Sequence, residues 1–382
     1  MNMPAKPISI SLPDTGEDEW QALREPLVTG WLTQGPKVAA FEREFARIHQ
    51  VKHALATTSC TTGLHLILAA MGIGPGDEVI VPAFTWVATA NVVLYCGATP
   101  VLVDVDRTTF NIDPVALKAK ISPKTKTIIA VHLFGLCADM AAIRKVAPGI
   151  PIVEDAACAA GSMLGPNFAG TLGHAAAFSF HPRKSITTGE GGMVTTQDTQ
   201  LAATMDMLRN HGASVSEEQR HRGPKPYILA DFNLLGFNYR MTDLQGALGL
   251  VQLGKLEKYI AQRSASASFY REALKRIPWL RLPEEPVGGR HGWQSFVCYV
   301  DPVRAPMPRN AMMEDLQSKG ISTRPGTHAI HMLGLYRERF GFKPEDFPGA
   351  RDCDQQTMAI PLHNRMSDED YQRVVDALRA LG

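Results

Sequence analysis

The stretch AAAFSFHPRKSITTGEGGMVTT, residues 175–196, decides the fold. It opens on an apolar run to Phe180 that predicts a buried β-strand, and it closes on a second predicted strand over residues 192–196. A polar, glycine-rich turn between the two carries Lys184. A lysine just past a strand end can lie over a cleft, where burial promotes its deprotonated, nucleophilic form. Position alone also allows a surface lysine in a turn beside Arg183.

Similar apolar runs recur through the first two thirds of the chain. They predict five further strands, over residues 53–57, 78–83, 99–105, 126–134 and 151–155. Helix-like stretches separate them over residues 62–72, 86–97 and 138–148. Near-continuous apolar runs are typical of strands that are covered on both faces. The alternation predicts an α/β domain built round a largely parallel sheet.

The pattern changes after about residue 240. Residues 242–277 predict two long helices with an apolar stripe. A strand, a helix and a closing helix follow over residues 294–300, 310–320 and 367–381, and Ser367 is the expected N-cap of the last. We therefore predict a large α/β domain over residues 12–250 and a smaller α+β domain over residues 251–382.

Composition excludes several classes of protein. The 382 residues carry a formal net charge of +1, which gives no electrostatic footprint for nucleic acid or an anionic membrane. No apolar run reaches the roughly 18 residues that span a bilayer, and the first 20 residues show no signal-peptide core, so we expect a cytoplasmic protein. The cysteines are scattered and predict neither disulfides nor a metal site: Cys60, Cys96, Cys137, Cys158, Cys298 and Cys353.

A second strand end carries acidic residues. The run PIVEDAACAAG delivers Glu154 and Asp155 at the end of the predicted strand over residues 151–155, and small residues then suggest the start of a helix. Ligands of open α/β sheets bind at the carboxyl ends of strands. A carboxylate there can keep a pyridinium nitrogen protonated, which makes such a ring an electron sink. The alternative is an ordinary acidic helix N-cap.

Two more strand ends complete the set. Residues 57–68 run from a strand through Ser59, Cys60, Thr61 and Thr62 into a helix, and the start of a helix binds anions such as phosphate. Ser and Thr are also common simple caps. Trp86 follows another strand, where its indole can stack on a flat ring or lie in the core. Taken together, these four segments supply a lysine, a carboxylate, a phosphate cradle and a stacking platform.

These segments resemble the DegT/StrS-type family of sugar aminotransferases, which are fold type I pyridoxal-phosphate enzymes. The lysine turn over residues 178–194, with GEGGM behind the lysine, is the most specific match. The other matching stretches are GWLTQGPKVAAFEREFA (30–46), PAFTWVATANVVLYCGATPVLVDVD (82–106), AVHLFGLCADM (130–140), VEDAACAAGS (153–162), GFNYRMTDLQGALGLVQLGKLE (236–257) and IPLHNRMSDED (360–370). The resemblance implies a large, mostly parallel seven-stranded sheet domain and a smaller C-terminal α+β domain.

The resemblance also implies roles for single residues. Lys184 would bind pyridoxal 5'-phosphate as a Schiff base and shuttle a proton, with the cofactor in the pyridoxamine form during part of the cycle. Asp155 would pair with the pyridine nitrogen, and Trp86 would stack on the ring. This chain departs from the family at Cys158, a cofactor-contacting position where Gln or His is usual.

The phosphate would be held by Ser179 and by Thr61, with the backbone around Cys60 and Thr62. The family usually has Gly-Thr-x-Ala in this loop, whereas this chain has Cys-Thr-Thr-Gly over residues 60–63; we expect the cradle to persist. In the family, the Asn of a GxNxR motif reaches across a dimer to the partner's phosphate. That motif places Asn238 there with Arg240 nearby, and it implies a homodimer.

The implied reaction moves an amino group from an amino acid, by analogy glutamate, to a keto sugar, with a nucleotide-linked 4-keto-6-deoxyhexose as the expected acceptor. Candidate substrate contacts are Trp31, Thr33, Gln34, His181, Arg324, His328 and His331. The alternatives are a cyclitol aminotransferase, a sugar dehydratase and a non-catalytic sensor. Related dehydratases typically carry His in place of the lysine, so Lys184 argues against that reading.

Overall fold

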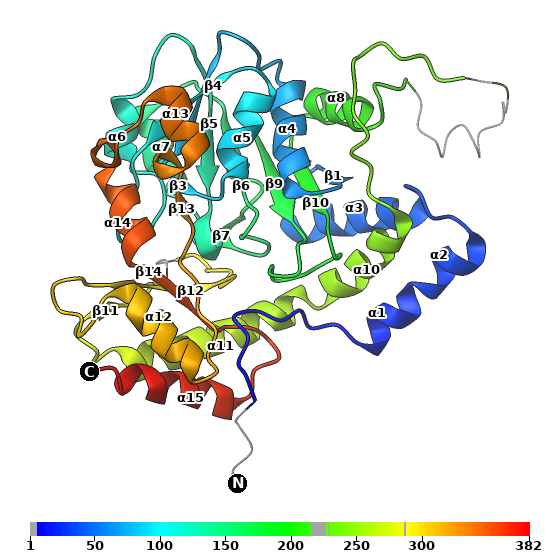
Figure 1. Ribbon diagram of the computed structural model, residues 1–382. Coiled ribbons are helices and arrows are strands. Elements are labelled where there is room, and N and C mark those ends of the chain that lie inside the picture. The colour runs from blue at the N-terminus through cyan, green and yellow to red at the C-terminus, as the bar shows by residue number, and fades with distance from the viewer. Residues whose placement is uncertain (1–5, 215–226, 228, 286–287) are drawn as a thin grey trace.

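The computed structural model describes residues 6–214, 227, 229–285 and 288–382. All seven predicted strands form, and they make one sheet (Figure 1). In spatial order the strands are β1 (His53–Thr57), β10 (Gly192–Thr196), β9 (Ala175–Ser179), β6 (Ile152–Asp155), β5 (Thr125–Val131), β2 (Glu78–Pro82) and β4 (Thr99–Val103). The strand bounds differ from the predicted ones by at most three residues.

The direction of the strands confirms the prediction of a mostly parallel sheet. Strand β10 is antiparallel to both of its neighbours, β1 and β9. The neighbouring pairs from β9 to β4 are all parallel. Parallel neighbours need crossover connections, which helices supply, and the helical stretches between the predicted strands provide them.

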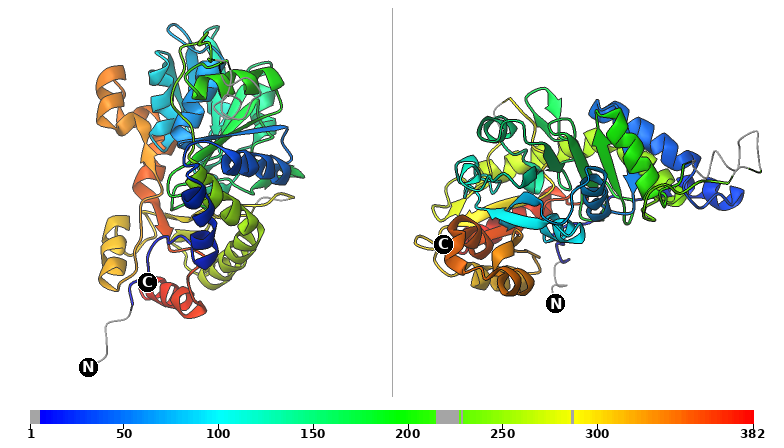
Figure 2. Two further views of the ribbon diagram at one scale, coloured as in Figure 1. Left: turned by 90° about the vertical axis from the view of Figure 1, so that its right-hand side faces the viewer. Right: turned by 90° about the horizontal axis from the view of Figure 1, so that it is seen from above.

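Helices cover both faces of this sheet (Figures 1 and 2). One core holds side chains of α4 (Cys60–Ala70), α5 (Ala88–Tyr95) and α8 (Thr199–Arg209). The other holds side chains of α3 (Pro36–His49), α6 (Pro114–Lys118), α7 (Met140–Val146) and α10 (Asp243–Gly254). Successive residues of β2 alternate between the cores, with Val79 and Val81 in the first and Ile80 in the second. A strand buried on both faces must be apolar at every position.

Asp243 joins two of the helices on the second face. It is the first residue of α10, yet its carboxylate accepts hydrogen bonds from backbone N–H groups at the start of α3. Oδ1 accepts from Gly35 and Val38 at 2.9 Å each, and Oδ2 accepts from Lys37 at 3.1 Å. The side chain therefore caps a helix that precedes it by some 200 residues and fixes the loop before that helix. Helices α1 (Glu17–Ala22) and α2 (Arg24–Thr29) lead into this loop.

The C-terminal region has its own antiparallel sheet, in the order β11 (Leu280–Arg281), β12 (Phe296–Val300) and β14 (Thr357–Ile360). Helices α12 (Arg309–Ser318) and α15 (Asp368–Arg379) and the second half of α11 (Leu256–Leu274) pack with it in a third core. Ser367 caps α15 as predicted, because its hydroxyl accepts a hydrogen bond from the Asp370 N–H. This confirms the smaller α+β unit.

Other C-terminal elements pack on the large sheet. Strand β13 (His328–Ala329) pairs with β3 (Phe84–Thr85), and α13 (Gly334–Phe340) and α14 (Pro348–Gln356) contribute side chains to the first core. Helix α11 begins in the second core and ends in the third. The expected division between residues 250 and 251 falls within α10 and stays a prediction. Among the residues that the structure describes, no helix has the length and apolar character needed to cross a membrane.

Candidate active site

Four of the predicted strands, β1, β10, β9 and β6, have ends that carry site residues at one edge of the large sheet. The last residue of β1, Thr57, pairs with the first residue of β10, Gly192, which in turn pairs with the last residue of β9, Ser179. Asp155 is the last residue of the neighbouring strand β6. It pairs with Ala177, two residues before Ser179 on β9. The first turn of α4 and the turn that carries Lys184 leave the sheet at the same edge. The sheet topology therefore brings together residues that are up to 135 positions apart.

The first turn of α4 can hold an anion. The hydroxyl of Ser59 accepts a hydrogen bond from the Thr62 N–H at 3.1 Å, and the Thr62 hydroxyl accepts one from the Ser59 N–H at 3.0 Å. This reciprocal cap uses the Thr62 side chain and leaves the N–H groups of Cys60 and Thr61 without an acceptor inside the helix. Two such N–H groups at the positive end of a helix suit a phosphate. We call this turn, residues 59–62, the cradle.

Glycine at position 192 is what allows β10 to lie against this turn. A Cβ atom on Gly192 would lie 2.4 Å from the carbonyl carbon of Ser59 and 2.6 Å from the Cys60 nitrogen. Both are backbone atoms of the cradle, so neither can swing away. Ser179 pairs with Gly192, which places its hydroxyl beside the cradle, where it already accepts the His181 N–H at 3.3 Å.

We expect Gly192→Ala to destabilise the protein by about 1–3 kcal/mol, because the added methyl group forces strand and cradle apart. The cofactor should also dissociate more readily. Thermal unfolding with and without cofactor measures both effects. Gly74→Ala is the matched control, since a Cβ atom there meets nothing within 4 Å. Equal unfolding temperatures for the two variants would contradict the prediction.

The Asp155 side chain is buried and is held by three donors. Its Oδ2 atom accepts the Thr89 hydroxyl at 2.7 Å, and its Oδ1 atom accepts the Ala157 N–H at 3.2 Å and the Cys60 thiol at 3.9 Å. The interpretation of Asp155 as a helix cap is wrong, and so is the helix expected after it, because turns follow β6 and the next element is β7 (Met163–Leu164).

Lys184 turns inward while its neighbour Arg183 is exposed, so the interpretation of Lys184 as a plain surface lysine is wrong. Its Nζ atom donates a hydrogen bond to the Cys158 sulfur at 3.1 Å. Burial by itself lowers the pKa of the Lys184 ammonium, but the Cys158 sulfur and, to a smaller extent, the Asp155 carboxylate raise it above its ordinary value. The free amino group is therefore protonated at neutral pH.

Behind Asp155 lies a polar pair of which sequence reasoning indicated Glu154 and missed His132. Glu154 and His132 are both fully buried, with 2.8 Å between the Glu154 Oε2 and His132 Nε2 atoms. The His132 Nδ1 atom accepts the Ala138 N–H, so Nε2 carries the hydrogen and donates it to Glu154. The N–H groups of Gly170 and Gly173 complete the carboxylate's partners. Because neighbouring strand residues face opposite ways, Glu154 supports the strand end while Asp155 faces the site.

Trp86 is 61% exposed, so the alternative interpretation as a core tryptophan is wrong. Pairing of β3 with β13 brings His328 beside it, with the two ring centroids 5.6 Å apart and the ring planes tilted by 43°. An exposed indole on a strand end is available for stacking, and its contact with the cofactor ring stays a prediction.

The expected substrate contacts fall into two groups. Trp31, Thr33 and Gln34 lie in the loop before α3, where the Trp31 ring N–H donates to the Gln34 carbonyl at 3.3 Å. The second group lies elsewhere: His181 is half-buried near Lys184, Arg324 and His328 are exposed, and His331 is buried against Phe347. The structure brings His328 to Trp86 and His181 to the lysine turn, whereas the contacts of His331 are with Phe347 and the Pro344 carbonyl.

Asn238 is exposed, and hydrogen bonds of the next residue, Tyr239, hold this segment close to the cradle. The Thr58 N–H donates to the carbonyl of Tyr239 at 3.1 Å, and the Tyr239 hydroxyl lies 2.9 Å from the His65 Nδ1 atom on α4. Arg240 donates to the Asn210 side chain at 2.8 Å. The structure thus holds Asn238 beside the cradle with its side chain accessible.

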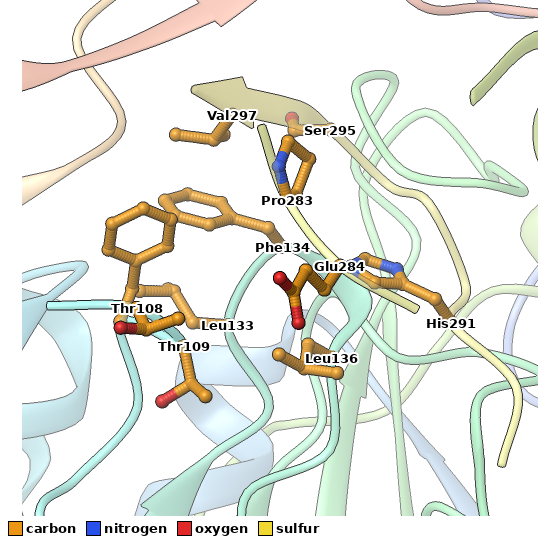
Figure 3. Close-up of a pocket in the computed structure, with 11 residues that line it drawn as sticks. Thr108, Thr109, Leu133, Phe134, Leu136, Pro283, Glu284, His291, Ser295 and Val297 are labelled. Atoms are coloured by element: carbon orange, nitrogen blue, oxygen red, sulfur yellow. The ribbon is translucent and has the colours of Figure 1, made fainter. Parts of the chain in front are cut away.

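A cavity next to this edge is too small for a cofactor. It has a volume of about 20 Å³ and lies between residues 108–110 and 133–136 on one side and Pro283, Glu284, His291, Ser295 and Val297 on the other (Figure 3). Leu133, Phe134 and Val297 give it a largely apolar wall. That volume holds about one water molecule, so this cavity does not accommodate a ring cofactor.

The residues at the sheet edge fit pyridoxal phosphate. An inward-turned lysine amine suits the aldehyde, a buried carboxylate suits the ring nitrogen, and the cradle that Gly192 keeps open suits the phosphate. Fold and donor set together define a pyridoxal-phosphate-dependent transferase of fold type I.

Comparison with known proteins agrees. Residues 13–379 match the model of the DegT/DnrJ/EryC1/StrS aminotransferase family, and the chain belongs to that family. It is 41% identical over 372 residues to the spore coat polysaccharide biosynthesis protein SpsC of Bacillus subtilis, covering 97% of this chain and 95% of SpsC.

Two solved structures extend the comparison. The putative sugar aminotransferase Spr1654 of Streptococcus pneumoniae, in its pyridoxamine-phosphate form, is 28% identical with a TM-score of 0.90, covering 98% of this chain and 97% of the other. PseC of Helicobacter pylori, an aminotransferase in pseudoaminic acid biosynthesis, is 27% identical with a TM-score of 0.90, covering 98% and 99%. The protein is a pyridoxal-phosphate-dependent aminotransferase of this family.

Proposed function

We propose that the protein moves an amino group from glutamate to a nucleotide-linked 4-keto-6-deoxyhexose. The observation that supports amino transfer is the placement of the Lys184 amine at the sheet edge, next to the buried Asp155. The names of two relatives support a sugar product, since one acts in spore coat polysaccharide synthesis and the other in pseudoaminic acid synthesis. The destination of the product would be a cell-surface polysaccharide.

The protein's own residues would divide the work as follows. Pyridoxal phosphate, when bound, supplies the electron sink that allows a proton to leave the carbon next to the transferred nitrogen. Lys184 Nζ would accept that proton and hold it for return. Asp155 would hold the ring nitrogen protonated, with Thr89 fixing its orientation through the 2.7 Å hydrogen bond. Trp86 would cover one face of the ring and exclude water from it.

Substrate recognition would fall to residues at the rim. The amino donor carries a carboxylate, which an arginine fork recognises well, and Arg324 presents an exposed guanidinium. His181 and His328 would offer hydrogen bonds to sugar hydroxyls near the lysine and near Trp86. In the loop before α3, the Oε1 atom of Gln34 is buried and has no hydrogen-bond partner among the described residues, so it would accept a donor from the substrate.

The working unit would be a homodimer. Asn238 is accessible beside the cradle, and by the family pattern it would reach the phosphate of a second copy. Leu229, Phe232 and Leu235, a few residues before it, are strongly exposed apolar side chains. Exposed apolar groups of this kind gathered on one segment mark interaction sites, and a second copy would cover them.

The first half of the proposed reaction can be followed by absorbance. The cofactor-loaded protein should show a visible band that bleaches on addition of excess glutamate, as the amino group moves to the cofactor. Keto sugars then offered singly should restore the band, and mass spectrometry should detect the amino sugar. Consumption of sugar without gain of nitrogen would indicate a dehydratase. If no amino acid bleaches the band of the cofactor-loaded protein, the non-catalytic sensor is favoured. If only a cyclitol ketone restores the bleached band, the acceptor is a cyclitol.

A further inference from the structure

The lysine that would carry the cofactor has an unusual neighbour. Its Nζ atom donates to the Cys158 sulfur at 3.1 Å, which is short for a hydrogen bond to sulfur. Cys158 is half-buried, unlike Cys137, Cys298 and Cys353, which lie fully in the cores. A thiol that faces a site and contacts its lysine differs from the small core hydrophobe that free cysteines usually are.

Hydrogen bonds and close packing fix the backbone at both Lys184 and Cys158. On the lysine side, the Lys184 N–H donates to the His181 carbonyl at 2.8 Å, and the Gln294 side chain donates to the Arg183 carbonyl at 2.9 Å. On the cysteine side, the Cys158 carbonyl packs against Gly135, where a Cβ atom would approach it to 3.2 Å. The contact between amine and sulfur is therefore built into the fold.

Other groups near the lysine do not take the place of the sulfur. The Asp155 carboxylate is occupied by Thr89 and by the Ala157 N–H, and within the described ranges no ion pair joins Lys184 to a carboxylate. The Cys60 thiol points to Asp155 and to the Ala177 carbonyl. Burial, and after it the Asp155 charge, raise the pKa of the Cys60 thiol well above its ordinary value, so this thiol stays neutral.

We propose that Cys158 is a positioning residue, which holds the amino group of Lys184 in place whenever the lysine is not bound to the cofactor. The inference rests on the proposed role of Lys184 in amino transfer and adds to it a residue of this chain that differs from the family's usual Gln or His. A free, flexible lysine has several rotamers, and a fixed partner keeps Nζ at the point where the proton must be accepted. The same contact opposes the effect of burial on the amine, because it favours the charged form.

Chemical labelling of the cofactor-free, full-length protein tests the proposal without turnover. Acetic anhydride modifies unprotonated amines, so mass spectrometry of the Lys184 peptide across pH 6–11 gives the midpoint of its titration. In Cys158→Ala the midpoint should fall by about one pH unit. At a fixed pH well below both midpoints, Lys184 should then be labelled about tenfold faster than in the wild type. Cys158→Ser should recover much of the shift, because a hydroxyl accepts the same hydrogen bond. Cys96→Ala is the matched control and should follow the wild type.

Superimposed labelling profiles for the wild type, Cys158→Ala and Cys96→Ala would overturn the proposal. If Cys158→Ala does not fold, Cys158→Val replaces it, because valine fills a similar volume without an acceptor. A labelling midpoint about one unit below that of the wild type supports the proposal, and a profile that superimposes on the wild type overturns it. Failure of the proposed function shows separately, as a loaded wild-type protein that does not respond to glutamate, whatever the labelling gives.

Discussion

Replacing Lys184 by alanine should lower the rate of amino transfer by about 10³-fold or more, with the fold retained. The amine would be both the cofactor's attachment point and the proton carrier, and loss of a positioned acid–base group alone costs about 10²–10⁴-fold. The neighbouring cation, Arg183, is exposed and so does not replace the lysine amine. The measurements are single-turnover bleaching with glutamate and the visible spectrum of the loaded protein.

Lys126→Ala is the matched control, since Lys126 is an exposed lysine of β5 on the large sheet. It should keep the wild-type rate and spectrum. Lys184→Arg preserves the charge but cannot form the covalent link, so it should be as inactive as Lys184→Ala. A Lys184→Ala protein that retains even a tenth of the wild-type rate would contradict the assignment and direct attention to another base at the rim.

Most of the fold was predictable from local pattern. Seven apolar runs gave seven strands because each is long enough to cross a covered sheet and is bounded by turn residues. The cap at Ser367 was predictable for the same reason, since a hydroxyl before an acidic first turn acts within four residues. The helix expected after Asp155 did not form, because small residues permit a helix without requiring it, and the Ala157 N–H bonds to the aspartate instead.

The site was predictable in its members and only partly in its contacts. Position at strand ends indicated Lys184 and Asp155, since parallel strands bring their ends together. Nothing local indicated that Cys158 would reach the lysine or that Thr89 would hold the aspartate, because these pairs are 26 and 66 residues apart. Gly192 was part of a recognised motif, but its reason, the close approach of the Ser59 carbonyl, exists only in three dimensions.

Replacing Asp155 by asparagine should lower the rate of amino transfer by about 10²-fold or more. The two side chains have nearly the same shape, and asparagine keeps an acceptor for the Thr89 hydroxyl, so the fold should survive. The lost feature is the negative charge, which would hold the ring nitrogen protonated, and removing one such electrostatic group from a buried site typically costs about 10²–10³-fold. Bleaching rates with glutamate, measured beside the absorption spectrum of the bound cofactor, test the expectation.

Thr89→Val provides the graded comparison, because it removes the 2.7 Å donor to Asp155 while leaving the charge. Its effect should be about tenfold, the loss of one hydrogen bond to a charged group. If the aspartate acted only through packing, Asp155→Asn would be nearly silent and Thr89→Val would match it. A large loss in Asp155→Asn with a small loss in Thr89→Val would instead show that the charge, rather than the shape of the strand end, is what this position supplies to the reaction.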